Sequence, residues 1–453
     1  MRIVLIATYE MGRQPMGLAS PAAWLREAGF EVACYDLGVA SLPPNALDGA
    51  AVVGFHVPMH TATRLTADLL PDVRKRFPDA ALCCYGLYAP VSESLLRERG
   101  ADVVLGGEFE AGLLAFCRRV AAGGGAAPQS EPRISLERLD FRVPDRGDLP
   151  ALDHYARFIL PDGTGRRAGY VEASRGCKHT CRHCPVVPVY NGRFRIIPRE
   201  IVLEDIARQV AAGAGHITFG DPDFFNGPGH AMPLVRALHE RFPGLSFDVT
   251  IKVEHLLLHA DLLPELRRCG CALVTSAVEA LDERILTYFD KRHTRDDFIE
   301  AVRLLDAAGL PLNPTFVTFT PWTTLESYAD LLETLGEQGL LETVSPIQLA
   351  IRLLIPSGSR LLELPEVQAV IGAYDDAQQT YVWRHRDPTV ERFFATVRDI
   401  VMDGVSRQAP RKEIVAAVWG ALGEAMGKDG SAPDLPPRRA RAAIPYLNEP
   451  WYC

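Results

Sequence analysis

Three cysteines stand close together in the stretch "ASRGCKHTCRHCPVVPVY": Cys177, Cys181 and Cys184, with the spacing C-x3-C-x2-C. Thiolates at these spacings can hold three corners of a cubane iron–sulfur cluster, because cysteine sulfur is the usual protein ligand of such clusters. The fourth iron then stays open, and an open coordination position separates catalytic metal sites from closed structural ones. Gly176 allows the chain to turn close to the cluster. The stretch therefore predicts a catalytic metal loop.

The same cysteines admit a second interpretation, a closed zinc site completed by His179 or His183. Structural zinc takes four ligands, and a zinc ribbon normally carries a second C-x2-C pair. The loop shows no second pair of this kind. The open cluster is therefore our preferred hypothesis, and zinc is its alternative.

Length and composition indicate a globular protein with two or three domains. The chain has 453 residues, of which 47% are hydrophobic and 23% are charged, an ordinary globular mix. No apolar run reaches about 18 residues, so we expect no membrane span, and "MRIVLIATYEMG" reads as a first strand rather than a signal peptide. We expect a cytoplasmic protein. The net charge of −9 argues against a broad nucleic-acid footprint, which needs clustered Lys and Arg.

The chain holds ten cysteines, but a cytoplasmic protein of this size is not expected to build a disulfide framework. Cys83 and Cys84 lie in an apolar strand, and Cys269 and Cys271 flank a glycine before another strand. Buried thiols are common core residues. Because no third ligand lies near either pair, we interpret both pairs as core rather than as a second cluster.

Residues 1 to about 120 alternate strand and helix patterns. The predicted strands are "RIVLIA", "EVACYDL", "AVVGFHV", "ALCCYGL" and "DVVLGG". This rhythm predicts a doubly wound, Rossmann-like parallel sheet. Such sheets bind ligands at the carboxyl ends of their strands. His56 and His60 lie at one of these ends, where they could face a ligand or be ordinary loop histidines.

Residues 121–167 read as a Gly/Pro/Asp-rich connector, and a second alternation follows over 168–356. Its six strand candidates are "GYVEAS", "HITFGD", "SFDVTIK", "LVTSAVE", "NPTFVTF" and "IQLAIRLLI". Six βα units predict a partial (β/α)6 TIM barrel with its chemistry at the carboxyl ends of the strands, and Cys177 follows the first of them. We expect residues 357–453 to form a helical carboxyl-terminal region with an extended tail.

The cysteine loop, with the aromatic His183 before its last cysteine and a place after the first barrel strand, resembles the radical S-adenosylmethionine superfamily. The resemblance implies that the open iron of a [4Fe-4S] cluster is chelated by S-adenosylmethionine. One electron from the reduced cluster then cleaves the sulfonium, and the usual product is a 5'-deoxyadenosyl radical. An electron donor such as a flavodoxin or ferredoxin is implied as a partner.

The resemblance extends to the ends of the later barrel strands. It places Asp221 and Asp223 near the amino group of S-adenosylmethionine and Lys252 near its carboxylate. It places Ser276 and Glu279 at the ribose, with Arg352 turned toward the site. The cofactor-binding candidates in this barrel are therefore Asp221, Asp223, Lys252, Ser276, Glu279 and Arg352.

Five of these six residues also have a plainer interpretation. Asp221 and Asp223 could cap a helix or turn. Glu279 could be a solvated carboxylate near a helix start. Lys252 and Arg352 could be surface charges.

A parallel sheet ahead of such a barrel resembles the cobalamin-binding class of this superfamily, whose members commonly transfer methyl groups. The connector "LDFRVPDRGDLPALDHY" is similar to that class as well. The D-x-H-x-x-G pattern that supplies a histidine to cobalt is absent from the chain. The alternatives are a cobalamin-binding sheet and a vestigial or partner-binding one.

The sequence ends in "IPYLNEPWYC", which resembles the CUAEP/CCAEP-tail radical S-adenosylmethionine (seleno)protein group. In that tail a cysteine is followed by selenocysteine or cysteine. We therefore expect Cys453 to be reactive and the natural protein to continue through selenocysteine, against the alternative that Cys453 is the true end. A thiol/selenol pair prefers soft partners such as arsenite, or it can cycle between reduced and oxidised forms.

The sequence thus predicts a radical S-adenosylmethionine enzyme that transfers a methyl or larger alkyl group to a small molecule with the help of cobalamin. An alternative is transfer of the 3-amino-3-carboxypropyl group of S-adenosylmethionine to arsenic or another soft acceptor. A non-enzyme alternative is an iron–sulfur electron carrier. A transfer-RNA modifier fits the acidic composition less well.

Overall fold

The computed structural model describes residues 1–124, 129–428 and 446–448. Its first sheet has six parallel strands in the order β2-β1-β3-β4-β5-β6. The strands are β1 (Arg2–Ala7), β2 (Glu31–Asp36), β3 (Ala50–His56), β4 (Ala81–Tyr85), β5 (Val103–Gly107) and β6 (Ile134–Ser135). The predicted doubly wound parallel sheet is confirmed, and only the short β6, from the connector, was not predicted.

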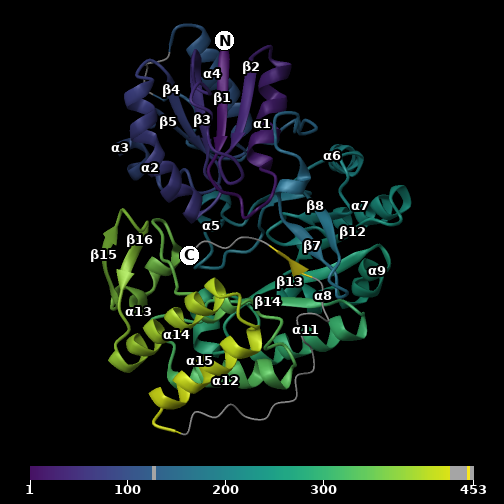
Figure 1. Cartoon of the computed structure of the whole chain (residues 1–453), viewed down its shortest axis with the longest axis vertical. Coiled ribbons are helices and arrows are strands. Elements are labelled where there is room, and N and C mark those ends of the chain that lie inside the picture. Colours follow the sequence, from purple (N-terminus) through teal and green to yellow (C-terminus); the bar gives the residue numbers. More distant parts are fainter. Residues whose placement is uncertain (125–128, 429–445, 449–453) are drawn as a thin grey trace.

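Both faces of this sheet are buried under helices (Figure 1). Side chains alternate along a strand, so Ile3 and Leu5 pack with α1 and α4, and Val4 and Ile6 pack with α2 and α3. These helices are α1 (Met16–Glu27), α2 (His60–Arg76), α3 (Glu93–Glu98) and α4 (Phe109–Ala121). Burial on both faces explains why the strands read as continuous apolar runs.

The second sheet lies beyond the carboxyl ends of the first (Figure 1). Its order is β14-β13-β12-β11-β8-β7-β17. Its strands are β7 (Arg157–Ile159), β8 (Gly165–Val171), β11 (His216–Phe219), β12 (Ser246–Thr250), β13 (Cys271–Glu279), β14 (Leu312–Phe316) and β17 (Tyr446–Leu447). The run from β8 to β14 is parallel, and β7 and β17 extend it by antiparallel pairing.

In place of a complete sixth barrel strand, the chain forms the 3-10 helix η4 (Pro346–Leu349) and a single parallel bridge between Phe319 and Arg352. Pro346 has no N–H to give to a strand ladder. The side chain of Gln348 accepts a hydrogen bond from the Phe316 N–H at 2.8 Å. A side chain thus replaces backbone pairing at this edge, and the barrel stays a half-barrel.

Helices cover the outer face of the second sheet with an apolar core. The covering helices are α6 (Arg199–Ala211), α7 (Pro228–Arg241), α8 (Val253–Leu258), α9 (Leu263–Arg268), α11 (Arg295–Ala307) and α12 (Leu325–Glu337). The shorter elements between them are η1 (Leu152–His154), β9 (Ser174–Gly176), α5 (Val187–Tyr190), β10 (Phe194–Ile196), η2 (Phe224–Asn226), η3 (Ala260–Leu262) and α10 (Glu283–Phe289). No helix in the described ranges is both long and apolar enough to cross a bilayer.

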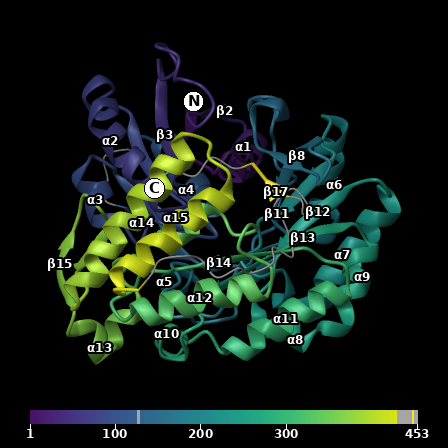
Figure 2. The ribbon, with the colours of Figure 1, turned by 60° about the horizontal axis from the view of Figure 1, so that its bottom comes forward.

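The carboxyl-terminal part packs α14 (Pro388–Ser406) and α15 (Arg411–Ala425) against α12 and η4 (Figure 2). The region is not purely helical, because β15 (Ile371–Asp375) and β16 (Thr380–Trp383) form an antiparallel hairpin. Two short helices precede this hairpin, η5 (Arg360–Glu363) and α13 (Pro365–Gln368).

Candidate active site

The cysteine loop leaves the carboxyl end of β8 through a small hairpin. β9 pairs antiparallel with β10 and so fixes both ends of the segment that carries the three cysteines. Gly176 has φ +73°, and a Cβ there would lie 2.3 Å from the Tyr190 ring. The left-handed backbone and the close contact both require glycine. The predicted turn at Gly176 is confirmed.

The three loop cysteines are free thiols, Cys181 buried and Cys177 and Cys184 partly exposed. Burial raises the pKa of Cys177 to about 11 and that of Cys184 to about 12. Backbone N–H groups of His179 and Val186 donate to their sulfurs, which favours the thiolate. A bound metal deprotonates a coordinating thiol outright. Three sulfurs with backbone donors on one short loop fit the ligand set of an iron–sulfur cluster.

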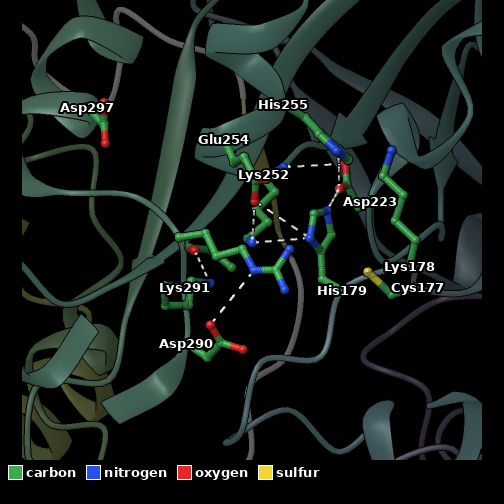
Figure 3. Close-up of polar contacts among 12 residues, drawn as sticks. Cys177, Lys178, His179, Asp223, Lys252, Glu254, His255, Asp290, Lys291 and Asp297 are labelled. Carbon is green, nitrogen blue, oxygen red and sulfur yellow. Dashed lines mark hydrogen bonds and ion pairs between the residues drawn. The ribbon is translucent and has the colours of Figure 1, made fainter. Parts of the chain in front are cut away.

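A buried carboxylate lies behind this loop (Figure 3). Asp223 Oδ2 lies 2.6 Å from His255 Nδ1 and 3.5 Å from His179 Nε2. Burial raises the pKa of Asp223, but the two histidines lower it further, to about 2. Asp223 also accepts a hydrogen bond from the Phe225 N–H. The helix-cap interpretation of Asp223 is confirmed, and its contact with the cofactor stays a prediction.

Lys252 closes the other side of His179 (Figure 3). Its Nζ lies 2.8 Å from Glu254 Oε2 and 3.3 Å from His179 Nδ1. Lys252 is only 7% exposed, so its interpretation as a surface charge is wrong. A metal could be held by one ligand atom each from Cys177, His179 and Asp223, since these atoms lie within 4.8 Å of one another. This group includes the predicted zinc ligands Cys177 and His179 but not Cys181 or Cys184.

Asp221 and Asn226 hold the start of the loop. Asp221 accepts hydrogen bonds from the Ala173 N–H at 2.9 Å and the Ser174 hydroxyl at 2.6 Å. Burial raises the pKa of Asp221 to about 7. Asn226 accepts from the Lys178 N–H at 3.2 Å. The cofactor role of Asp221 stays a prediction, and sequence reasoning missed Asn226, although it stands in the same "FGDPDFFN" stretch.

Glu279 lies at the end of β13 with φ +72°. Its carboxylate is 3.1 Å from His183 Nε2 and 3.4 Å from Lys291 Nζ. Burial raises the pKa of Glu279, but Lys291 and His183 lower it to about 2. Its interpretation as a solvated helix-start carboxylate is therefore wrong. Asp282 takes that role by capping α10.

Ser276 also lies on β13, three residues before Glu279, and its side chain is buried. Thr275 and Leu273 line the cavity inside the half-barrel. Because side chains alternate along a strand, Ser276 lies on the opposite face from Thr275. Its hydroxyl has no hydrogen-bond partner among the described residues. A ribose contact by Ser276 stays a prediction.

Arg352 pairs with Glu391 of α14 through two nitrogens, at 3.1 and 2.9 Å. Its guanidinium also lies 3.7 Å from the centre of the Trp383 ring. These contacts fix the carboxyl-terminal helices to the bridge at the barrel edge. A cofactor role for Arg352 stays a prediction.

The two histidines at and just after the carboxyl end of β3, His56 and His60, have different surroundings. His56 is buried, with Nδ1 3.2 Å from Glu10 Oε2. It lines a cavity between the two sheets. His60 Nε2 lies 2.6 Å from the Gln378 carbonyl, in the turn of the β15–β16 hairpin. Of the two histidines, His56 alone lines this cavity.

Two cavities meet at this place. The interface cavity, about 210 Å³, is bounded by the carboxyl ends of the first sheet and by the cysteine loop. The lumen cavity, about 720 Å³, fills the half-barrel. Their common walls are Met11, Arg13, Gly220 and Pro222. A molecule between the sheets would therefore face both the cysteine loop and the lumen.

A buried ion cluster joins the two sheets beside the interface cavity. Arg175 contacts Glu110 at 2.7 Å, Glu172 at 2.6 Å and Glu108 at 3.5 Å. Glu108 also accepts a hydrogen bond from the Tyr190 hydroxyl at 3.0 Å. Sequence reasoning missed this cluster. The only signal was two acidic residues in "GGEFE", at a strand end expected to bind ligands.

Residues 171–335 match the family model described as the Radical SAM superfamily. The hopanoid C-3 methylase of Methylococcus capsulatus is 25% identical over 325 residues, which are 68% of this chain and 62% of that protein. The ribosomal protein uS12 methylthiotransferase RimO of Pelotomaculum thermopropionicum is 23% identical over 197 residues, 42% of this chain and 44% of that protein. The chain thus spans less than two thirds of either relative.

Solved structures show the same fold. The radical enzyme OxsB, with aqua-cobalamin and S-adenosylmethionine bound, aligns with a TM-score of 0.72 and 14% identity over 89% of this chain and 66% of that one. The radical S-adenosylmethionine methyltransferase TsrM from Kitasatospora setae aligns with a TM-score of 0.60 and 18% identity over 74% and 71%.

Residues 171–335 carry a Radical SAM domain, and this domain together with the methylase relative indicates an enzyme. The domain implies a [4Fe-4S] cluster and S-adenosylmethionine as cofactors, so the cluster takes precedence over zinc at the loop. The electron-carrier alternative is thereby set aside. Cys453, on which the selenocysteine and arsenic hypotheses depend, lies outside the described residues.

Proposed function

We propose that this enzyme transfers a methyl or larger alkyl group from S-adenosylmethionine to a small molecule with the help of cobalamin. The observation that carries the proposal is that the interface cavity, beside the cysteine loop, and the lumen cavity are neighbours with common walls. The hopanoid C-3 methylase relative and the cobalamin-bound OxsB structure support the same reaction class.

Cys177, Cys181 and Cys184 would hold the cluster on its three protein-ligated corners. A bound cluster supplies one electron to the sulfonium of S-adenosylmethionine. Glu279, pinned between Lys291 and His183, fixes the segment around the last cysteine. His183 in turn stacks on Phe289, with ring centroids 4.4 Å apart. These contacts hold the loop rigid, which a reactive metal site needs.

Part of cobalamin would lie in the interface cavity, which at about 210 Å³ is too small for the whole molecule, and bound cobalamin supplies a methyl carrier between donor and acceptor. The cavity is formed by strand ends and by loops of both sheets, the usual ligand position in an open parallel sheet. The His56 ring lies close to Gly17, since a Cβ there would be 2.2 Å from its Nε2. His56 thus forms part of the cavity wall, and its contact with a bound ligand stays a prediction.

We further propose that a cytoplasmic flavodoxin or ferredoxin supplies the electron. Two features of the chain support this. No helix in the described ranges could span a membrane, and a radical S-adenosylmethionine domain needs a one-electron donor.

The test is anaerobic reconstitution, followed by addition of cobalamin, S-adenosylmethionine and a strong reductant. We expect about four irons per chain, a shifted cobalamin absorbance on binding, and S-adenosylmethionine cleavage to 5'-deoxyadenosine. Cys181→Ala should lose most of the iron and all cleavage. Cys269→Ala is the matched control, because Cys269 is a buried thiol outside the loop, and it should keep both.

Two results would contradict the proposal. An intact cluster without cobalamin binding argues against a carrier between the sheets. 5'-Methylthioadenosine as the cleavage product indicates 3-amino-3-carboxypropyl transfer instead, and arsenite is then the first acceptor to test.

A further inference from the structure

The lumen face of the half-barrel is polar. Thr250, Thr275 and Thr315 project from three neighbouring strands into the lumen cavity, with Asn313 beside them. All four are partly exposed to it. The interior of a closed (β/α) barrel is normally filled by branched apolar side chains. A hollow of about 720 Å³ lined by hydroxyl and amide groups is instead suited to a polar small molecule.

Two carboxylates line this cavity, Asp221 and Asp248, and both oxygens of Asp221 already accept hydrogen bonds, from the Ala173 N–H and the Ser174 hydroxyl. Asp248, in the middle of β12, is 5% exposed and lines the cavity. Its Oδ1 accepts hydrogen bonds from the Thr218 hydroxyl at 2.6 Å and from His216 Nε2 at 2.8 Å. Its Oδ2 accepts none from any residue that the structure describes. Among the described residues, no Lys or Arg nitrogen lies within 4.0 Å of the Asp248 carboxylate.

The partner histidine does not neutralise this carboxylate. His216 is fully buried, and burial lowers its pKa despite the neighbouring Asp248. At pH 7 it is therefore the neutral imidazole. A buried carboxylate without a cationic partner is costly, so a ligand that brings a cation to Oδ2 would be favoured.

Asp248 is also held in place. Arg166 Nη1 donates to Ser246 Oγ at 2.9 Å, and Ser246 Oγ lies 2.8 Å from His216 Nδ1. The carboxylate of Asp248 requires the tautomer that carries its hydrogen on Nε2, which leaves Nδ1 as the ring nitrogen beside Ser246. Phe158 stacks on the His216 ring at 3.6 Å. A rigid support of this kind orients a binding group without serving the core.

The cations near the cavity are directed elsewhere. Arg411 Nη1 donates to the carbonyls of Thr343 and Val344, each at 2.7 Å. Arg13, at the mouth shared with the interface cavity, lies over the Tyr170 ring at 5.3 Å. Asp248 is thus the carboxylate of this cavity that keeps an oxygen without a hydrogen-bond donor among the described residues.

We propose that the lumen cavity binds the substrate, a polar small molecule that places an ammonium group on Asp248 Oδ2 and its hydrogen-bonding groups on the threonine wall. The inference rests on the proposed function and names the substrate class of that site. A steroid-like hydrocarbon, without such groups, would leave this wall unsatisfied.

Three probes with the same cyclohexyl ring separate charge from shape: cyclohexylamine, cyclohexanol and cyclohexanecarboxylate. Their dissociation constants are measured by ligand-observed NMR on the anaerobic, cluster-reconstituted full chain at pH 7. We expect the amine to bind roughly tenfold more tightly than the alcohol, with the carboxylate weakest. Asp248→Asn should bring amine and alcohol to equal affinity. Asp261→Asn, which changes an exposed carboxylate in η3, should keep the preference.

Equal binding of the three probes to the wild-type chain overturns the inference, even if the Asp248→Asn variant fails to fold. An amine preference that survives in Asp248→Asn overturns it as well. S-Adenosylmethionine cleavage is assayed in the same preparation. Cleavage without amine preference counts against this inference alone, and amine preference without cleavage counts against the proposed function alone.

Discussion

At the residue scale, the chemistry of this enzyme is surrounded by buried charges whose partners are fixed. Asp223 and Glu279 both keep a pKa near 2 although they are buried. Each does so because basic side chains lie against it. His179 and His183, both on the cysteine loop, are among those partners. The loop is thus tied to the ends of β11 and β13 by electrostatics as well as by its hairpin.

His293 gives a pH-dependent test at this scale. Burial and the nearby Lys291 and Lys252 lower its pKa to about 4. Between pH 6.5 and 4 the unfolded chain binds a proton that the folded chain does not, so stability falls as the pH falls. From pH 7 to 4 we expect His293→Leu to gain about 3 kcal/mol in unfolding free energy relative to wild type. Urea unfolding at both pH values measures this difference.

His154→Leu is the control, because His154 is exposed. Its difference from wild type should stay constant across the same pH range. If the His293→Leu difference is equally constant, burial of this histidine does not cost stability in acid.

At the element scale, the position of the active site depends on a few backbone features. The β9–β10 hairpin begins two residues after β8 and carries the cysteine loop. Gly176 closes its last pair with Phe194. Gln348 replaces a strand at the opposite edge. These features fix the cysteine loop at one edge of the second sheet and end the sheet at the other edge, so the half-barrel does not close.

Gly176→Ala tests the hairpin. The new Cβ would lie 2.3 Å from the Tyr190 ring and 2.5 Å from the Arg193 carbonyl oxygen. We expect the loop to shift and the chain to retain less than about half of the reconstituted iron, which holds to its cysteines only in the right geometry. Iron and sulfide analysis measures this loss.

Gly163→Ala is matched to it. Gly163 has φ +83°, but nothing lies within 4 Å of the new Cβ. It should therefore cost only about 1–2 kcal/mol of backbone strain and keep its iron. Equal iron content in the two variants would show that the contact with Tyr190 is not needed for the loop.

At the scale of the whole molecule, the two sheets are joined by buried polar contacts. Arg175, next to the cysteine loop, meets Glu108 and Glu110 of the first sheet's last βα turn. Arg146 adds a second link by pairing with Asp205 of α6 and with the Gln14 side chain. The interface cavity lies between these parts, so its shape depends on both links.

Arg175→Met tests the coupling between the sheets. It leaves three carboxylates without their cation, and breaking a buried pair costs about 3–5 kcal/mol. We expect the variant to have a lower thermal midpoint and two unfolding transitions in place of the single transition of the wild-type chain. Calorimetry of the reconstituted chain measures both.

Arg97→Met is the comparison variant, since the Arg97–Glu93 pair lies within helix α3, with both side chains partly exposed. An exposed pair contributes about 0–1 kcal/mol, so the transition should stay single. A single transition in Arg175→Met as well would show that the sheets are held together by other contacts.

Much of the fold was predictable because it follows from local patterns. The strands of both sheets are short apolar runs between glycine-terminated helices, and the cysteine spacing has one strong interpretation. The prediction of a sixth barrel strand was wrong. "IQLAIRLLI" is apolar enough for a strand, but Pro346 and the Gln348 side chain interrupt the backbone pairing that a strand needs. The second failure concerned charge, since sequence does not tell a buried Lys252 from a surface one.

The sequence by itself indicated the Radical SAM domain, because three cysteines close together in the chain can share one cluster and leave an iron open. Only the tertiary structure decided what surrounds that cluster. Asp248 and His216 stand on different strands, and Arg175 and Glu110 belong to different sheets. Such pairs are separated by many residues of chain, so their contacts exist only after the strands have paired and the sheets have met.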